Sequence, residues 1–467
     1  GGLSSVMILD SIIAGISPIN RITFQPDEAA GGNVENVLLQ IDQTTQTSTA
    51  LVSIKTDYTT IRNLTFQDVD SAAAGANYLL SVSESGPSNP TNEGIVVEGC
   101  RFIGNSLPPV GSTFGTDIGI YGSISVSGIV VRRNSFQRLM RSVTIGFLSD
   151  IPAGSVIVED NEVLSATGSG VLFGHVIAVN ARNVIIRRNY LNNAGGMGSY
   201  WGITVKADTG LVERNYILNG GSAHNNSYTA IRVGGLYSGN ARSMMVVNNM
   251  ISGSISLAQW FPQGERVGID VHTRAAVIIH NTIVHPATEF QNSKGIKLVG
   301  DSSTVLNNIV IDYGSPSFHV ASIVLFDQSG GVSGLISDYN VFYYSQPGNF
   351  IVTRGTVRYS SLGTYQAATG LDSHSVFKNI DFVNDTLYPH LSDCQAQDPE
   401  LGGIPFPGIV DDIDGDLRSL TAPTRGADEG RLRSTRMFGD VFRISVPGAP
   451  FSVAAGKFDN LMADGLA

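Results

Sequence analysis

The segment VIIRRNYL, residues 184–191, joins a run of mostly apolar residues to an asparagine, Asn189, and a second short apolar run. The same order of residues recurs at Asn63, Asn134, Asn161, Asn215, Asn249, Asn281, Asn308 and Asn340, and once with Cys100 in the asparagine position. Neighbouring copies are separated by 26 to 37 residues. A pattern that returns at such a spacing predicts stacked structural repeats joined by loops of variable length.

A second strand-like run precedes most copies of this pattern. Examples are SVTIG (142–146), GITVKA (202–207), AIRVGG (230–235), GIDVHT (268–273) and GIKLVG (295–300). Short β-branched runs separated by Gly, Asn and Ser, without helical stretches between them, are typical of coiled parallel strands. The predicted fold class is all-β: a parallel β-helix, or solenoid, of about ten rungs.

The recurrent asparagine has a structural explanation in this fold. Asparagine tolerates the left-handed αL conformation at a sharp corner. Stacked side-chain amides can also hydrogen-bond between rungs that lie about 4.8 Å apart. We therefore predict an internal ladder of asparagines rather than a set of catalytic amides.

Over roughly residues 20–345 the chain resembles the right-handed parallel β-helix of the pectate-lyase-like superfamily. Residues 401–430, LGGIPFPGIVDDIDGDLRSLTAPTRGADEG, resemble the closing segment of many large secreted bacterial β-helix proteins. The resemblance implies an extracellular or cell-surface location. We predict rungs over 1–345, C-terminal rungs and a closing segment over 346–430, with 346–400 wrapping the C-terminal rungs, a linker over 431–449, and a strand–helix cap over 450–467.

The cap is predicted from the residues of 450–467. Phe451 and Val453 form a short strand pattern, and Phe458, Leu461 and Met462 follow at the spacing of one helix face. In the family that the chain resembles, such a cap commonly leads into a segment like residues 1–24. We therefore expect these five residues to pack against the first rung of another copy, or of the next unit in a tandem protein, near Leu3, Val6 and Ile8. The alternative is a tail that folds back on its own body.

Composition excludes several classes of protein. The net charge is −11, and no basic stripe interleaved with aromatic residues occurs, which argues against a nucleic-acid partner. No apolar run of 18 residues occurs, which argues against a membrane span. Cys100 and Cys394 are too few for a disulfide scaffold, although one long-range disulfide stays open.

A polar face is predicted from the preceding strands, aligned by their Gly-Ile starts. Because side chains alternate across a strand, two rows should face solvent while residues such as Ile203 and Val205 fill the core. The first row is Thr144, Leu172, Thr204, Arg232, Asp270, Lys297 and Val324; the second is Lys206, Gly234, His272, Val299 and Phe326. The candidate catalytic residues are Lys206, Arg232, Asp270, His272 and Lys297.

The order of residues around GITVKADTGLVERNYILNGG (202–221) and AIRVGG resembles a segment of the chondroitinase B and alginate lyase family. This resemblance implies that Lys206 is the base that removes the proton next to a uronate carboxylate, and that Arg232 neutralises the developing enolate. That family binds Ca²⁺ through acidic residues just before the lysine, whereas GGMGSYWG (195–202) contains no carboxylate. Saccharide binding without turnover, hydrolysis by Asp208, Asp270 and Asp301, and a plain solvated surface stay open as alternatives.

The loop DDIDGD offers a candidate Ca²⁺ site in Asp412, Asp414 and Asp416, which stand at alternate positions. It lacks the glycine placement and the distal glutamate of an EF-hand. A solvated turn paired with Arg418 or Arg425 is the competing interpretation. We expect no cofactor to be required, with Ca²⁺ as the one candidate.

Because a fold alone does not define a function, two functions are carried forward. The first is an extracellular structural or surface protein that forms a head-to-tail rod, filament or adhesive stalk. The second is a polysaccharide-acting enzyme, in particular a uronate lyase. The expected partners are other copies of the chain and extracellular polysaccharide.

Overall fold

The computed structural model divides the chain into residues 1–430 and 431–467. The structure describes residues 7–10, 22–26, 37–41, 50–68, 78–83, 92–104, 118–123, 126–139, 141–146, 153–164, 173–192, 199–218, 228–234, 243–253, 265–285, 292–313, 323–327, 334–345, 350–384 and 388–430. The predicted linker and the predicted cap residues Phe451, Val453, Phe458, Leu461 and Met462 lie outside these ranges, as do Leu3 and Val6. Ile8 belongs to a described strand, but its side chain is outside the description.

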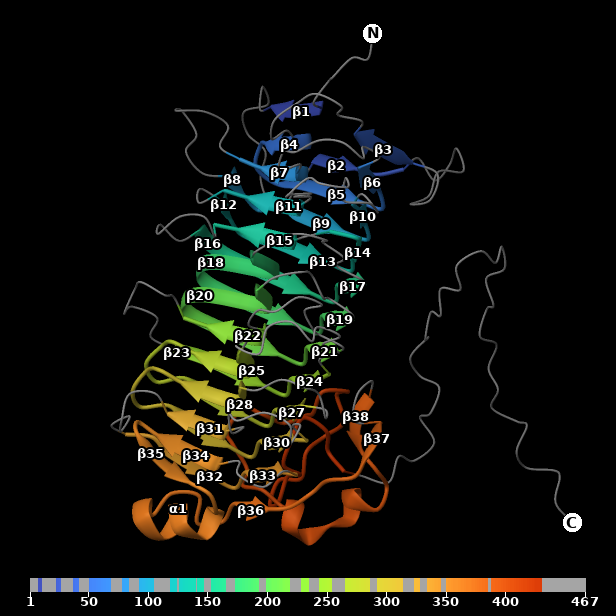
Figure 1. Cartoon of the computed structure of the whole chain (residues 1–467). Helices are drawn as coiled ribbons and strands as arrows, with labels where there is room; N and C mark the ends of the chain where they lie inside the picture. Colours follow the sequence, from blue (N-terminus) through green and yellow to red (C-terminus); the bar gives the residue numbers. More distant parts are fainter. Residues whose placement is uncertain are drawn as a thin grey trace, which may run out of the picture. The chain divides into compact units, whose positions relative to one another are not determined.

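Three lines of strands run along the solenoid, and each full rung contributes one strand to each line (Figure 1). Line 1 contains β1 (Met7–Asp10), β4 (Ala50–Lys55), β7 (Tyr78–Val82), β11 (Ile118–Gly122), β15 (Arg141–Ile145), the first part of β18 (Phe173–Arg187) and of β20 (Ser199–Glu213), β22 (Tyr228–Val233), β25 (Glu265–Val271), β28 (Asn292–Leu298), β31 (Ile323–Asp327) and β34 (Phe350–Arg354).

Line 2 contains β2 (Ile22–Phe24), β5 (Thr59–Arg62), β9 (Val96–Glu98), β13 (Ile129–Arg132), β16 (Ala153–Glu159), the second part of β18 and of β20, β23 (Ser243–Val247), β26 (Val277–Ile279), β29 (Thr304–Leu306) and β32 (Ile336–Asp338). Line 3 contains β3 (Leu38–Ile41), β6 (Thr65–Asp68), β10 (Arg101–Ile103), β14 (Ser135–Gln137), β17 (Glu162–Leu164), β19 (Tyr190–Asn192), β21 (Tyr216–Leu218), β24 (Met250–Ser252), β27 (Thr282–His285), β30 (Ile309–Asp312), β33 (Val341–Tyr344) and β36 (Val376–Phe377).

Strands of successive rungs pair in parallel in all three lines, as between β20 and β22 in line 1, β23 and β26 in line 2, and β21 and β24 in line 3. Two short strands, β8 (Asn92–Glu93) and β12 (Val126–Ser127), add a further parallel pair between rungs. The predicted parallel β-helix is confirmed. Line 3 has 12 described strands, somewhat more than the ten rungs that the repeat count predicts.

Aligned apolar side chains fill the interior. Ile203, Ile231, Ile269 and Ile296 occupy the same register position in four consecutive rungs, and all are fully buried. In line 3, the rings of Phe66 and Phe102 stack with 4.9 Å between centroids, and the column continues from Phe102 to Phe136 at 5.0 Å. Identical residues of successive rungs therefore stack on one another, so the stability of each rung depends on its neighbours.

The predicted asparagine ladder lies at the corner between lines 2 and 3. It runs through Asn134, Asn161, Asn189, Asn215, Asn249, Asn281, Asn308 and Asn340, all buried. Each Nδ2 donates to the Oδ1 of the next asparagine over 2.9 to 3.1 Å. The same Oδ1 also accepts the backbone N–H of the donating asparagine, as Asn215 Oδ1 does from Asn189. The ladder thus satisfies buried corner groups that are not paired between strands.

Two details of the ladder differ from the prediction. The αL residue is the one before each ladder asparagine, with φ between 51° and 56°, as in Arg214, so the asparagine itself is not the residue that needs αL. Asn63 is such an αL residue, with φ 54°, and Leu64 shares the register position of Cys100. The prediction that Asn63 belongs to the ladder is therefore wrong, because the alignment placed it one residue late.

The residues after β33 close the C-terminal end. β35 (Val357–Tyr359) turns back antiparallel on β34, and α1 (Leu362–Thr369) follows, with Ser361 as its N-cap and Gly370 in αL conformation after it. Next come β37 (Phe382–Asn384), β38 (Tyr388–Leu391) and two short 3₁₀ helices, Gln395–Gln397 and Pro399–Leu401. Leu391 and Leu401 pack with Ile309, and Ile413 packs with Met250. The predicted C-terminal wrapping segment is thus present and covers the C-terminal part of line 3.

Candidate functional site

The predicted catalytic residues lie on consecutive rungs of line 1. Arg232 on β22 is paired in register with Asp270 on β25, and Asp270 with Lys297 on β28. His272 follows β25, and Lys206 on β20 lies in the strand that pairs with β22. We call these five residues the line-1 cluster.

Three members of the line-1 cluster are in contact. His272 Nε2 is 2.9 Å from Asp270 Oδ1 and 3.1 Å from Arg232 Nη2. Arg232 Nε is 3.9 Å from Asp270 Oδ2. His272 Nε2 thus contacts both the guanidinium and the carboxylate, and the carboxylate lies within ion-pair distance of the guanidinium.

The line-1 cluster is more buried than predicted. Arg232 and Asp270 are buried, at 9% and 4% exposure, and Thr204 is buried beside them. Lys206, His272 and Lys297 are half-buried. The prediction that the whole first row faces solvent is therefore wrong. Residues on adjacent rungs cover one another, since the spacing of parallel strands is smaller than the length of an arginine or histidine side chain.

The register also corrects two members of the first predicted row. Ala178 lies between Thr144 and Thr204, at the position predicted for Leu172, which is outside the described residues. Phe326 pairs with Lys297, at the position predicted for Val324. The alignment failed at these rungs because their strands do not begin with Gly-Ile.

Sequence reasoning missed the partners of Lys297. Its Nζ is 3.0 Å from Glu265 Oε2, and the other Glu265 oxygen pairs with Lys294. Burial lowers the pKa of Lys294 to about 8, and the nearby charge of Lys297 acts in the same direction. Glu265 and Lys294 stand at the starts of β25 and β28, before the Gly-Ile positions used for alignment.

His175 is a second histidine of line 1 that the aligned rows did not include. Its ring stacks on Trp201 with 4.4 Å between centroids, and its Nδ1 is 3.0 Å from Thr204 Oγ1. Burial lowers the pKa of His175 to about 3, with the charges of Arg141 and Arg232 adding to the effect. His175 is therefore neutral near pH 7 and is suited to hydrogen bonding rather than to holding positive charge.

The loop that holds Asp412, Asp414 and Asp416 is tied to backbone groups. Asp412 Oδ1 accepts the backbone N–H of Asp414 and of Asp416, and its Oδ2 accepts the backbone N–H of Glu429 over 2.8 Å. Burial raises the pKa of Asp412 to about 6. Asp414 contacts residues outside this triplet, and Asp416 is exposed. The Ca²⁺ site stays a prediction, and the Asp412 oxygens already accept these N–H donors.

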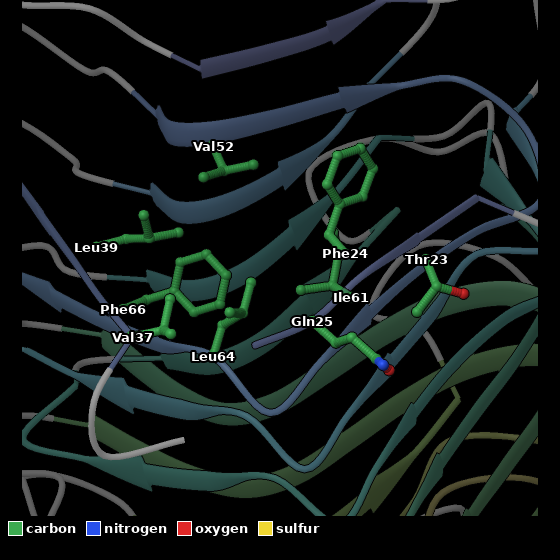
Figure 2. A pocket seen from close by; sticks show the side chains of 9 residues that line it. All are labelled: Thr23, Phe24, Gln25, Val37, Leu39, Val52, Ile61, Leu64 and Phe66. Carbon is green, nitrogen blue, oxygen red and sulfur yellow. The ribbon is translucent and has the colours of Figure 1, made fainter. Parts of the chain in front are cut away.

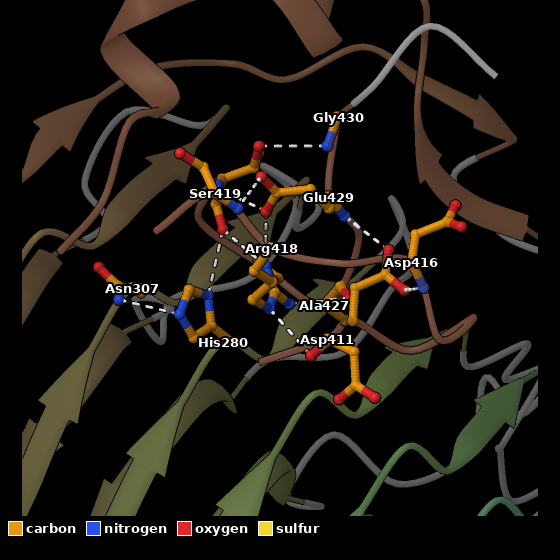
Figure 3. A network of polar contacts seen from close by, with 12 residues as sticks. His280, Asn307, Asp411, Asp416, Arg418, Ser419, Ala427, Glu429 and Gly430 are labelled. Carbon is orange, nitrogen blue, oxygen red and sulfur yellow. Dashed lines mark hydrogen bonds and ion pairs between the residues drawn. The ribbon is translucent and has the colours of Figure 1, made fainter. Parts of the chain in front are cut away.

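Arg418 is the centre of the polar network that attaches the closing segment (Figure 3). It contacts Glu429 over 3.2 Å, Asn248 Oδ1 over 2.8 Å, and the backbone oxygens of Thr424, Gly426 and Ala427. On the same face, His280 lies between Asn307 and the Thr424 carbonyl, 3.1 Å from each. Asn248, His280 and Asn307 are αL corner residues. The closing segment therefore hydrogen-bonds directly to the corner of the solenoid.

A cavity of about 280 Å³ lies among the first strands of the three lines (Figure 2). Its lining is mostly apolar and comes from β2 to β6: Thr23, Phe24, Gln25, Val37, Leu39, Val52, Ile61, Leu64 and Phe66. Val52, Ile61 and Phe66 are buried core residues, whereas Phe24, Val37 and Leu39 are half-buried. The apolar interior thus continues into a hollow at the N-terminal rungs.

No protein-family model matches the sequence, and no curated protein matches it. Among solved structures, the chain is similar to a double mutant of the tailspike protein of E. coli bacteriophage HK620, in complex with a pentasaccharide. The two sequences are 10% identical and the TM-score is 0.39, over 70% of this chain and 65% of the tailspike chain. The chain therefore spans somewhat less than two thirds of that tailspike's length. Among the described residues, no helix has the length and apolar character needed to cross a membrane.

Cys100 is buried and Cys394 is exposed, and both are free thiols. Burial raises the pKa of the Cys100 thiol to about 12. The Cys100 thiol is therefore protonated near pH 7, and a protonated thiol is a poor nucleophile.

Proposed function

We propose that this chain is an extracellular or surface structural protein whose β-helices associate end to end into a rod or stalk. The observation that carries the proposal is the apolar cavity at the N-terminal rungs. The cavity adjoins the buried core, so an occupant with apolar side chains would extend the solenoid's own packing.

The occupant that we propose is the segment 450–467 of a second copy. Its apolar residues, Phe451, Val453, Phe458, Leu461 and Met462, follow the strand and helix pattern of a cap. Burial of five such side chains contributes about 7 to 15 kcal/mol before the cost of ordering them. That is enough for a stable joint. A head-to-tail contact of this kind does not close on itself and therefore builds a linear assembly.

A cross-linking experiment tests which chain supplies the tail. Two variants are made in a Cys394→Ser background, one with Gln25→Cys at the cavity and one with Leu461→Cys in the tail. Oxidation of the mixed chains should give a covalent heterodimer, because each variant carries only one half of the pair. The matched control replaces the cavity cysteine with Ala367→Cys on the exposed face of α1 and should give none.

Deletion of 450–467 gives a second, independent readout. We expect the full chain to form concentration-dependent multimers in sedimentation velocity and the deleted chain to stay monomeric. The single variant Phe458→Asp should act like the deletion, whereas Leu420→Asp, at a residue that is already 85% exposed, should not. If the deleted chain assembles as before, or if the cysteine pair joins only within one chain that carries both, the proposal is wrong.

We propose uronate polysaccharide lyase activity as a second candidate, and the contact of Arg232 with His272 and Asp270 favours it. Lys206 would take the proton next to the uronate carboxylate, a carbon–carbon double bond would form as the neighbouring carbon–oxygen bond breaks, and the leaving oxygen would take up a proton. Arg232 would balance the charge of the carboxylate.

The test is the ultraviolet absorbance of unsaturated uronate products with alginate and chondroitin as substrates. Lys206→Ala should abolish product formation and leave the circular dichroism spectrum unchanged. Arg182→Ala, which removes an exposed cation from the neighbouring rung, is the control and should retain full activity. Binding of the saccharide without product formation would show that the chain recognises the saccharide but is not a lyase.

A further inference from the structure

Three side chains of metal-ligating types outside the line-1 cluster meet where the closing segment contacts β38. They are His390 on β38, Asp414 in the DDIDGD loop and Asp428 near the end of the closing segment. One nitrogen of His390 and one oxygen of each aspartate lie within 4.8 Å of one another. The His390 side chain is fully buried, whereas Asp414 keeps 30% of its side chain exposed.

The distances fit a shared cation better than direct hydrogen bonds. His390 Nδ1 is 3.4 Å from Asp414 Oδ2 and 3.4 Å from Asp428 Oδ2. Hydrogen bonds from nitrogen to oxygen usually span about 2.7 to 3.2 Å. Ligands that each lie about 2.0 to 2.2 Å from a tetrahedral Zn²⁺ are about 3.3 to 3.6 Å apart.

A tyrosine of the solenoid orients both the histidine and one carboxylate. Tyr216 on β21 donates its hydroxyl to Asp414 Oδ1 over 2.6 Å, and the Tyr216 hydroxyl oxygen is 3.2 Å from His390 Nε2. With its proton directed at Asp414, the Tyr216 oxygen accepts from His390 Nε2–H. In the neutral tautomer the lone pair of Nδ1 then points toward the two carboxylates, an arrangement that a cation between them stabilises.

Asp428 is positioned independently of the tyrosine. Its Oδ2 accepts the backbone N–H of Leu391 over 2.9 Å, which fixes the carboxylate beside β38. All three ligand groups therefore have a neighbour that holds their orientation, as ligands of protein metal sites commonly do.

We propose that His390, Asp414 and Asp428 bind a divalent first-row transition metal such as Zn²⁺, and that the ion fastens the closing segment to β38. One imidazole and two carboxylates suit Zn²⁺, whereas Ca²⁺ takes six to eight oxygen ligands. The partly exposed Asp414 gives the ion an approach from solvent, and water completes the coordination. The bound ion connects β38, the DDIDGD loop and residue 428 at one point.

The test is isothermal titration calorimetry of the untagged chain after dialysis against a chelator. ZnCl₂ should bind at one ion per chain and raise the midpoint of thermal unfolding, while CaCl₂ and MgCl₂ at equal concentration should not. Co²⁺ in place of Zn²⁺ should give the visible absorption bands of a four-coordinate site with nitrogen and oxygen ligands.

Variants assign the ligands. His390→Gln and Asp428→Asn should each abolish the heat of Zn²⁺ binding, and Asp414→Asn, at the most exposed ligand, gives the same test with the least risk to the fold. Tyr216→Phe should weaken binding by about 10- to 100-fold without abolishing it, because it removes only the orienting hydroxyl. The control is His374→Gln, which removes another His–Asp pair, with Nδ1 2.7 Å from Asp338, and should leave binding unchanged.

Two results would overturn the proposal. One is a folded chain that binds neither Zn²⁺ nor Co²⁺. The other is Zn²⁺ binding that persists in both Asp414→Asn and His390→Gln.

Discussion

Asn189 donates its side-chain amide to Oδ1 of Asn215 over 3.0 Å, and the same oxygen accepts the backbone N–H of Asn189 over 3.1 Å. Asn215 in turn donates to Asn249 and to the backbone oxygen of Ile186. Every ladder asparagine thus satisfies groups in the rungs before and after its own. The ladder ends at Asn340, whose amide donates to the buried carboxylate of Asp372 over 3.0 Å.

Asn215→Leu should lower the free energy of unfolding by about 1 to 3 kcal/mol, because it leaves the buried N–H donors of Asn189 without their acceptor. The measurement is urea denaturation followed by circular dichroism. The double variant Asn189→Leu, Asn215→Leu should cost less than the sum of the two single variants, since both remove the same contact. Two neutral single variants would show that the ladder does not stabilise the fold.

Glu98 predicts a loss of stability in acid. It accepts hydrogen bonds from Arg62, Arg132 and Arg133. Burial on its own would raise the pKa of Glu98, but these three arginines outweigh it and lower the pKa to about 2 from 4.5. As the pH falls, Glu98 is therefore protonated in the unfolded chain at a higher pH than in the folded chain. The stability that the three arginine contacts contribute is present above pH 4.5 and is lost as the pH falls toward 2. Glu98→Gln should lack that part of the pH dependence in denaturation midpoints measured from pH 5 to 2.

The lowered pKa of His175 predicts a second loss of stability, at a higher pH than that of Glu98. Burial, together with the charges of Arg141 and Arg232, lowers its pKa to about 3 from 6.5. Between these values the unfolded chain binds a proton that the folded chain does not, so stability falls on acidification by up to about 1.4 kcal/mol per pH unit. His175→Gln should reduce the slope of the denaturation midpoint between pH 6.5 and 5 without removing it, because burial also lowers the pKa of His280 and of His285. An unchanged slope in the variant would assign this pH dependence to other groups.

The sequence predicts those parts of the molecule that repeat. A ladder asparagine, its apolar neighbours and the strand before it recur in eight consecutive rungs, so the structure of one rung predicts that of the next. Asn63 was misassigned because asparagine suits both the ladder and the αL corner, and only the register separates the two roles. The burial of Arg232 and Asp270 also depends on which side chains of neighbouring rungs cover them, and a periodic pattern does not carry that information.

The contacts of the closing segment could not be predicted in this way. Tyr216 and Asp414 are 198 residues apart and meet because the closing segment returns to a rung near the middle of the solenoid. Nothing in the sequence near Tyr216 marks that rung as the one covered. The resemblance of 401–430 to a closing segment indicates that it follows the last rungs, but not which corner residues it contacts.

Gly426 provides the sharpest test of how closely the closing segment fits the solenoid. It has φ 88°, and a Cβ there would lie 2.7 Å from both Ile309 Cδ1 and Thr282 Oγ1, closer than van der Waals contact allows. Gly408 has nearly the same φ, 87°, but a Cβ there would meet no atom within 4 Å. Both alanine variants carry the backbone strain of an L-residue at positive φ, about 1 to 2 kcal/mol, and only Gly426→Ala adds the clash with the rungs.

We therefore expect Gly408→Ala to lower the unfolding free energy slightly. Gly426→Ala should lower it further and should speed hydrogen exchange of residues 388–430 relative to the strands of line 1. Equal exchange rates in the two variants would show that the fit between Gly426 and the solenoid does not hold the closing segment in place.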